Sequence, residues 1–593
     1  MPSKSRLLSP LLLLCGVTIL ALVIVLPPHE KISIVGSAFG LLIALEGLHL
    51  LDERNGLVIG RSMTWLRYLP LPIGIAVSLL GLLSPLPIVS AFGLAVALTL
   101  LFTLSTLTNV SKVHIACLAV LIAASIGYNI FFYYPLINGV VDTWGYLSVA
   151  SAIVQRGRFP DVISALASDR YYFPLPIMSI DSAILSSVTG INLELSMLLC
   201  PGSLILLQPL LVFLLSRSVF DDNQGAALSA FIAVTESAVT VFIGGPIAQS
   251  MGISLLFLFL ILLFRRMRSG NHVGAAFLFF LMLTAAHGAV GLISIALVAF
   301  VTLLERSSDK RIILPLVVMY LGYVMMTNVM EHVIRNVRWT VESILDWIFT
   351  PTLRTGSELY GTGSNGLTFI WWGLPVALAL FYVMQRRKQG SSWVYAGLGL
   401  LGLSFVANVI APQFPIERYG GLAAWLILAM TGGTALRTVA RTRRQLVVLV
   451  PLMLIVCLSA VVNPALSPQF GFYQAYGSPL PTTNADRTAL EWVNRHVFVT
   501  VLADSVCRAY LIFSRYQSGT LNISGIVKYD PRDMLSALKP GYALFVRSNI
   551  SMTHANGQTY HCFVSVSVNP QSNQVINIIY NSGCDAVEIS GWI

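Results

Sequence analysis

Long apolar runs separated by short polar segments make up most of this chain. All but one of these runs are close to the ~20 residues that a helix needs to cross a bilayer. The pattern therefore predicts an all-α polytopic membrane protein with about 15 transmembrane helices before residue 465. The runs fall at residues 8–27, 31–50, 66–83, 86–107, 113–135, 183–217, 224–245, 249–265, 272–287, 288–304, 312–330, 366–385, 391–411, 419–436 and 445–464. The 183–217 run is long enough for one span with an added turn or re-entrant piece.

Positive charge in the connecting segments predicts which side of the membrane each one faces. Basic residues collect in short cytoplasmic loops, so Lys4 and Arg6 place the N-terminus in the cytoplasm. Alternation of the spans then puts every strongly basic connection on that same side. These connections are residues 52–67, 265–268, 305–311, 385–388 and 437–444. Segments 138–182 and 331–365, and the tail from residue 465, are predicted to lie outside.

Composition agrees with a membrane protein and argues against a nucleic-acid partner. The 593 residues are 56% hydrophobic and 10% charged, with a mean hydropathy of +0.78, whereas soluble domains have about 25% charged residues. The formal net charge is +10. Because the basic residues lie in the short connections between spans, this charge reports membrane topology rather than a polyanionic partner.

The tail differs from the rest of the chain and predicts a small C-terminal extracytoplasmic α/β domain. TNADRTALEWVNRH is typical of a capped amphipathic helix, and FVTVLADS, YALFVRS, HCFVSVSV and QVINIIY are typical of strands. Asn522 and Asn549 begin glycosylation sequons. Cys562 and Cys584 would pair as a disulfide outside the cell. We therefore divide the chain into an N-terminal extension of about four spans (1–110), a membrane core (111–464) and the outer domain (465–593).

The longest polar interval of the first half carries the main candidate for chemistry. Asp142 follows a predicted span and precedes SVASAIVQRG, which predicts a short amphipathic helix. A carboxylate at the membrane surface can take a proton from a hydroxyl that attacks a lipid-linked substrate. A solvated loop residue or a helix N-cap is the alternative for Asp142.

Further polar residues are predicted on the same side as Asp142. Asp169 and Arg170 precede Tyr171 and Tyr172, which can stack on a sugar or belong to an interfacial aromatic belt. Arg418 can bind a phosphate, or extend to the interface beside Glu417. His287 lies at the outer end of an apolar run, where a packing histidine is the alternative.

The order of a span, Asp142, an amphipathic helix, RFPD and then YYFPLP resembles the first external loop of the GT-C superfamily. These membrane glycosyltransferases use polyprenyl-phosphate-linked sugars, and include protein mannosyltransferases, the aminoarabinose transferase of lipid A and oligosaccharyltransferases. The resemblance covers residues 113–464 in layout. It implies that Asp142 is the catalytic base or a ligand of a divalent metal such as Mg²⁺ or Mn²⁺. It also implies that Tyr171–Pro176 corresponds to the Tyr/Pro segment.

The chain departs from this family in three respects. About four spans precede the span that leads into the loop, Asp142 has no paired acidic residue, and the tail has no WWDxG motif. The missing motif argues against oligosaccharide transfer to asparagine. Residues 355–358 resemble a short motif of the oligosaccharyltransferases, although Glu358 also fits a solvated loop acid.

The function that the resemblance implies is hexosyl transfer from a polyprenyl- or dolichyl-phosphate sugar to a glycan, lipid or protein on the outer face. Two alternatives remain open. A transporter or lipid flippase would depend on the intramembrane acids Glu46 or Glu236, and an envelope assembly protein would depend on the tail. Phosphate-binding glycine loops, HExxH and nucleophile-elbow motifs do not occur.

Overall fold

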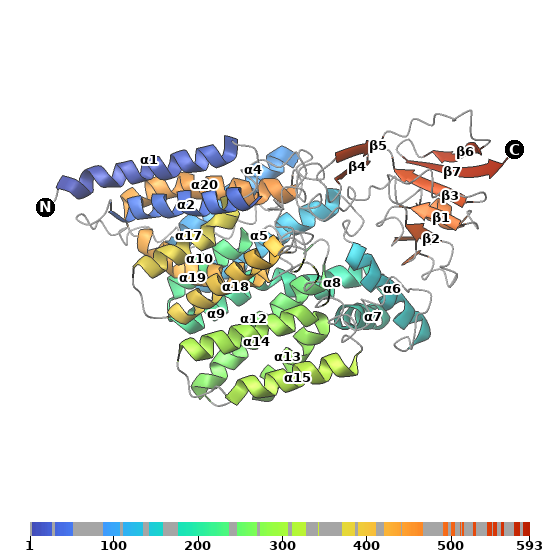
Figure 1. Ribbon diagram of the computed structural model, residues 1–593, viewed down its shortest axis with the longest axis horizontal. Helices are drawn as coiled ribbons and strands as arrows, with labels where there is room; N and C mark the ends of the chain where they lie inside the picture. Colours follow the sequence, from blue (N-terminus) through green and yellow to red (C-terminus); the bar gives the residue numbers. More distant parts are fainter. Residues whose placement is uncertain are drawn as a thin grey trace.

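A computed structural model gives the architecture of the chain (Figure 1). It describes the helices and strands named below with a few flanking residues, together with residues 490–495, 510–511 and 513–514 and the isolated residues 243, 338, 342 and 345. Statements about structure refer to these residues.

The helices follow the apolar runs of the sequence. They are α1 (Ser3–Val25), α2 (Glu30–Leu50), α4 (Pro87–Thr106), α5 (Lys112–Tyr133), α6 (Val141–Arg156), α7 (Ile177–Thr189), α8 (Leu193–Leu206), α9 (Gln208–Phe220), α10 (Asn223–Val234), α12 (Ala248–Ser269), α13 (Val273–Ala286), α14 (Gly288–Leu304), α15 (Ile313–Met326), α17 (Ile370–Met384), α18 (Ser391–Ile410), α19 (Gly421–Val439) and α20 (Arg443–Ala465).

Eight of the described helices, namely α1, α2, α4, α5, α12, α18, α19 and α20, have 19 to 23 residues, close to the length that crosses a bilayer. Among the described residues, Leu193–Phe220 and Gly421–Val439 are both long enough and apolar enough to cross a membrane. With 10% charged residues in the whole chain, these helices identify a membrane protein. The predicted span at 66–83 lies outside the described residues.

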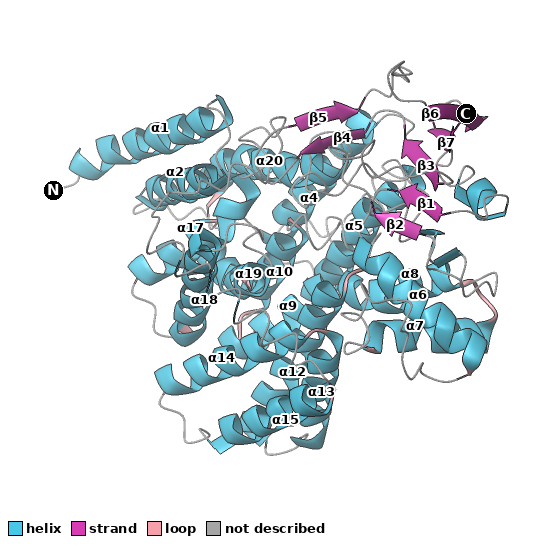
Figure 2. Ribbon diagram, turned by 45° about the vertical axis from the view of Figure 1, so that its right-hand side comes forward, coloured by secondary structure: helices cyan, strands magenta, loops and turns pink. Residues whose placement is uncertain are grey.

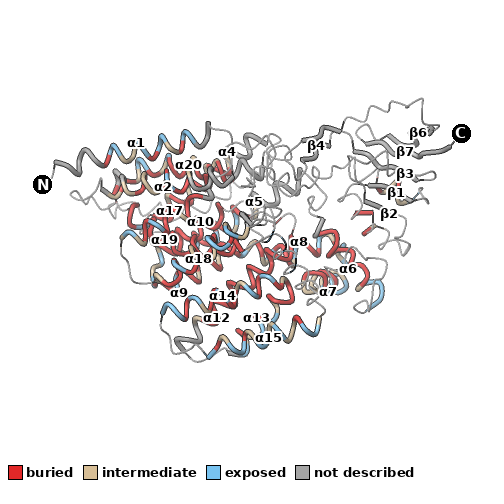
Figure 3. Tube along the Cα trace, viewed as in Figure 1, coloured by how far each residue is buried: buried red, intermediate tan, exposed pale blue. Residues whose placement is uncertain are grey.

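α19 lies at the centre of the helical bundle. Nearly all of its residues are buried, and Figure 3 shows α19 and α10 largely red while α1 and α15 carry exposed positions. α19 packs against α10, α17 and α18. A Cβ on Gly433 would overlap the carbonyl oxygen of Gly225 and the backbone nitrogen of Ser229, so only glycine permits this approach of α19 to α10. Small residues at helix contacts are typical of membrane bundles.

The long apolar run at 183–217 forms three helical segments rather than one. α7 ends at Gly190, whose φ of 74° suits glycine. α8 and α9 then meet at Leu207, and Pro209 lies in the first turn of α9. Because proline has no N–H to donate, the hydrogen-bond ladder is interrupted at this point. The added turn that the run length predicts is therefore present.

The C-terminal region forms a five-stranded mixed sheet in the order β2-β1-β3-β7-β6 and a two-stranded sheet of β4 and β5. β1 is parallel to β2 and β3, and β7 is antiparallel to β3 and β6. The strands are β1 (Thr500–Ala503), β2 (Ile526–Lys528), β3 (Tyr542–Arg547), β4 (Ile550–Thr553), β5 (Thr559–Cys562), β6 (Gln574–Asn581) and β7 (Asp585–Trp592).

The sheet and the short helices α6 and α7 lie at the same end of the molecule. Figure 1 shows them opposite the N-terminus along the longest axis, and Figure 2 shows α6, α7 and α8 below β1 and β2 after rotation. By the rise per residue, the 13 residues of α7 extend about 20 Å, which is too short to cross a bilayer. Described parts of two segments predicted to be outside, 138–182 and the tail, therefore lie at one end.

Candidate functional site

Asp142 is the second residue of α6. The sequence predicts a helix from residue 148, but α6 begins seven residues earlier because Trp144, Tyr146 and Leu147 continue its buried face. Asp142 thus lies in the first turn, and is neither a loop residue nor the N-cap. The N-terminal turn of a helix favours negative charge.

The residue after Asp142 fixes the start of α6 to the helical bundle. Thr143 is fully buried, and its hydroxyl donates to the carbonyl oxygen of Pro246 at 2.8 Å. Pro246 lies two residues before α12, and its ring also lies near Gly202 of α8. The position of Asp142 is therefore set by two bundle helices as well as by α6.

The next residue fixes α6 to the C-terminal region. The ring of Trp144 lies 5.1 Å from that of Tyr510 in a T-shaped arrangement and 5.4 Å from that of Phe513. All three side chains are buried, together with Leu490 and Val493 of the short helix at 490–495. We call Trp144, Tyr510 and Phe513 the outer aromatic cluster. Asp142 therefore begins a helix held between the bundle and the C-terminal region.

α7 supports α6 from the other side. The Ser179 hydroxyl donates to the carbonyl oxygen of Tyr146 at 2.8 Å. The Ser182 hydroxyl donates to the carbonyl oxygen of Met178 at 2.8 Å and also contacts the sulfur of Met197 on α8. α6, α7 and α8 form one packed layer at this end of the molecule.

Asp181 of α7 is an acidic residue that the sequence reasoning missed. Burial raises the pKa of its carboxyl from 3.8 to about 6, because the charged form loses hydration. The signal was present in the sequence as a single acid in the apolar stretch IMSIDSAILSSV. This carboxyl is able to change protonation near pH 6, within the layer of α6, α7 and α8.

His287 lies between α13 and α14 and packs against α12. It is half-buried, and a Cβ on Gly252 of α12 would lie 3.2 Å from the His287 Cβ. Its carbonyl oxygen accepts from the N–H groups of Val290 and Gly291 at the start of α14. These contacts fix the backbone of His287, and its binding role stays a prediction.

Several predicted site residues lie outside the described residues. These are Asp169, Arg170, Tyr171, Tyr172, Glu236, Glu358, Arg418, Asn522, Asn549 and Cys584. For Cys562 the structure describes the backbone, within β5. Arg338, a lower-ranked candidate in the 331–365 segment, donates from Nε to Glu342 at 2.9 Å, and both side chains are exposed.

Within the described part of the chain, no group of three His, Cys, Asp or Glu side chains gathers as a metal site. The metal role stays a prediction, and the mechanism below contains no step through a metal.

Comparison with known proteins gives structural likenesses only. No family model and no curated protein sequence matches the chain. The Archaeoglobus fulgidus oligosaccharyltransferase in its apo form is 13% identical with a TM-score of 0.43, over 68% of this chain and 64% of that one. This chain thus matches less than two thirds of that enzyme. ArnT from Cupriavidus metallidurans bound to undecaprenyl phosphate is 12% identical with a TM-score of 0.35, over 80% of this chain and 97% of that one. Both are GT-C glycosyltransferases, the superfamily that the sequence resembles.

Proposed function

We propose that this protein is a GT-C-type glycosyltransferase that moves a hexose from a polyprenyl- or dolichyl-phosphate donor to an acceptor on the outer face of the membrane. One observation carries the proposal. Asp142 lies in the first turn of α6, and the next two residues fix that turn to the bundle through Thr143 and to the C-terminal region through Trp144. A catalytic carboxylate needs such fixed placement, because misplacement by about 1 Å costs up to 10²-fold in rate.

The mechanism assigns general-base catalysis to Asp142. Its carboxylate takes the proton of the acceptor hydroxyl while the hydroxyl oxygen attacks the anomeric carbon of the donor sugar. The bond between that carbon and the phosphate oxygen breaks, and polyprenyl phosphate leaves with the electron pair. Attack from the face opposite the phosphate inverts the configuration. A base in this role contributes about 10²- to 10⁴-fold to the rate.

Other residues of the outer segments bind the substrates in this proposal. Arg418 stabilises the departing phosphate, since its guanidinium offers two parallel donors to phosphate oxygens. Tyr171 and Tyr172 stack on the sugar beside Asp169 and Arg170. His287 and Glu358 have further binding roles. A divalent metal held by Asp142 remains part of the proposal, to be tested by chelation.

The proposed topology has about 15 spans, a cytoplasmic N-terminus and an outer α/β domain from residue 465, with glycans at Asn522 and Asn549 and a Cys562–Cys584 disulfide. Polar contacts between distant connections support this assignment of the connections to the two sides of the membrane. The Gln445 amide donates to the Leu48 carbonyl oxygen and the Ser392 hydroxyl to the Glu305 carboxylate. Each contact joins segments that alternation places on one side, as do the contacts of Thr143 and Trp144 at the other end.

A second candidate function is ion-coupled transport, favoured by one observation. Glu46 lies within α2, which packs against α1 and α17, and its Oε2 is buried without a hydrogen-bond partner in the described structure. An ionisable residue at membrane depth costs about 2.5–3.5 kcal/mol on insertion scales and is a functional candidate by default. In this alternative, activity would depend on Glu46 rather than on Asp142.

The deciding experiment measures transfer of labelled sugar from polyprenyl-phosphate hexoses in membranes that contain equal amounts of folded protein. Asp142→Asn should reduce transfer by at least about 10²-fold, because the amide cannot take a proton. Glu305→Gln, which removes a carboxylate at the predicted cytoplasmic end, should retain transfer. Equal transfer by wild type and Asp142→Asn would refute the mechanism. Loss of substrate uptake in Glu46→Gln, with no transfer by wild type, would favour the transporter.

A further inference from the structure

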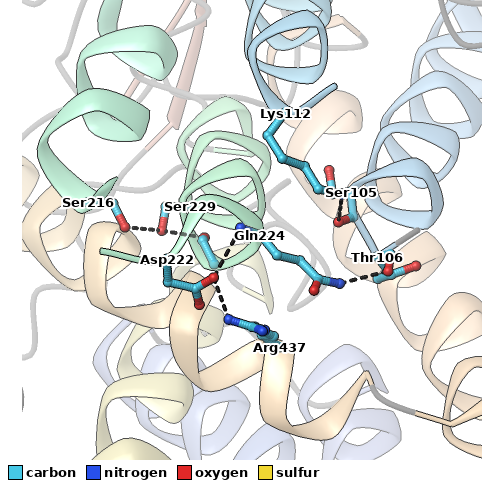
Figure 4. A network of polar contacts seen from close by, with 9 residues as sticks. Ser105, Thr106, Lys112, Ser216, Asp222, Gln224, Ser229 and Arg437 are labelled. Atoms are coloured by element: carbon cyan, nitrogen blue, oxygen red, sulfur yellow. Dashed lines mark hydrogen bonds and ion pairs between the residues drawn. The ribbon is translucent and has the colours of Figure 1, made fainter. Parts of the chain in front are cut away.

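Three helix connections meet around one set of polar side chains at the end of the bundle that the sequence predicts to be cytoplasmic. We call Lys112, Asp222, Gln224 and Arg437 the inner polar cluster (Figure 4). Lys112 begins α5, Asp222 and Gln224 lie at the α9–α10 connection, and Arg437 lies in the last turn of α19. The cluster therefore joins segments that are far apart in the sequence.

The described hydrogen bonds show how the cluster is built. Asp222 caps α10 by accepting from the backbone N–H of Gln224 at 3.0 Å, and the same oxygen accepts from Arg437 at 2.5 Å. The Gln224 amide donates to the carbonyl oxygen of Thr106 at 2.7 Å. Lys112 donates to the carbonyl oxygen of Ser105 at 3.1 Å. Figure 4 shows these side chains converging from α4, α5, α10 and α19.

The cluster has an excess of positive charge. Lys112 and Arg437 lie near enough for their charges to interact, and Asp222 is the carboxylate that interacts with both. Over the three connections, residues 107–112, 217–224 and 437–444, there are six basic and two acidic residues, a net charge of +4. Each connection joins one helix C-terminus to one helix N-terminus, so the helix dipoles offset one another. The ionised side chains therefore determine the sign.

Of the two cations, Arg437 is the more accessible. The Arg437 side chain is 46% exposed although it pairs with Asp222, which is 10% exposed. A guanidinium has five N–H donors, and the pair with Asp222 uses one at Nη1. Lys112 is half-buried beside it. Basic pockets between transmembrane helices on the cytoplasmic side suit the headgroups of anionic lipids.

We propose that the inner polar cluster binds the phosphate group of an anionic phospholipid in the cytoplasmic leaflet. The lipid phosphate would accept from Arg437 and offset the repulsion between Arg437 and Lys112. It would thereby hold the α4–α5 pair against α19. This binding is independent of the transferase activity proposed above.

The test uses the full chain purified in a neutral detergent, with thermal unfolding followed as lipid is added. Phosphatidylglycerol should raise the unfolding temperature, while phosphatidylcholine and inorganic phosphate should not. Removing one cation should weaken the apparent affinity about fivefold, from about 1 kcal/mol per basic residue. Lys112→Gln and Arg437→Gln should each show this loss. Arg338→Gln, at an exposed arginine of the outer 331–365 segment, should leave it unchanged.

Two further measurements keep the proposal falsifiable if Arg437→Gln fails to fold. The double variant Asp222→Asn/Arg437→Gln removes both halves of the ion pair, and should fold and lose the response to phosphatidylglycerol. In wild type, the rise in unfolding temperature caused by phosphatidylglycerol should become smaller as salt is raised from about 0.05 to about 0.5 M, because the contact is electrostatic. An equal gain from phosphatidylcholine, an equal gain from phosphate alone, or an unchanged response in the double variant would overturn the proposal.

Discussion

Replacing Trp144 with alanine should lower transfer by the folded protein while leaving donor binding largely intact. Trp144 is fully buried against Tyr510 and Phe513. Truncating a buried aromatic side chain to alanine costs about 3–5 kcal/mol, of which each aromatic pair accounts for about 0.5–1.5 kcal/mol. The substitution removes the contact that orients the first turn of α6. We therefore expect a loss in kcat of up to about 10²-fold, since Asp142 would no longer be held in place.

Trp393 provides the matched control. It is also a buried tryptophan, 4% exposed, with its ring 6.3 Å from that of Phe264. It lies at the start of α18, whose N-terminus is predicted to be cytoplasmic. Trp144→Ala and Trp393→Ala should lose similar stability in thermal unfolding, but only the first should lose kcat per folded molecule. Equal kcat values for the two variants would refute the positioning role of the outer aromatic cluster.

Three further predictions concern stability. Gly433→Ala should destabilise the protein by about 3 kcal/mol, since its Cβ would overlap Gly225. Gly402→Ala has open space around its Cβ and should gain up to about 1 kcal/mol from helix propensity. Thermal unfolding of the two variants tests this, and a Gly433→Ala variant as stable as wild type would contradict the tight packing. Burial raises the pKa of Asp181 to about 6, so folding favours the neutral carboxyl, and the stability of the protein is greatest below pH 4 and falls as pH rises to 6. Asp181→Asn should therefore be more stable than wild type by about 2 kcal/mol at pH 7 and equally stable at pH 4. A difference between the two proteins that stays constant across that range would contradict the prediction. Arg338→Ala should change stability by less than about 0.5 kcal/mol because its ion pair with Glu342 is exposed, and a larger loss in the same assay would show an unseen role.

Much of the helical fold was predictable from apolar periodicity. The runs at 86–107, 391–411 and 445–464 correspond to α4, α18 and α20 within a few residues, because a span must be apolar over its whole length. YALFVRS and QVINIIY likewise correspond to β3 and β6. The span count and the domain boundaries stay predictions.

The surroundings of the site were less predictable. Asp142 stood out because it is an acid at the edge of a long apolar run, which is a local signal. Its helix is supported by Pro246 and Tyr510, which are about 100 and 370 positions away by the numbering. Contacts between such distant positions cannot be predicted from a single sequence. Asp181 was missed because an isolated acid in an apolar helix has no spacing pattern, and its pKa shift comes from burial by packing.

The close contact of α10 with α19 also constrains how the chain is made. The Ser229 hydroxyl donates to the carbonyl oxygen of Met430, 201 residues later. At about 5–20 residues per second, the ribosome needs about 10 to 40 s to make that stretch. Throughout that interval, α10 has α9 as a neighbour, with the Ser216 hydroxyl 3.1 Å from that of Ser229, but it lacks α19. A chain released before residue 440 would therefore leave the glycine face that α19 covers without its partner helix.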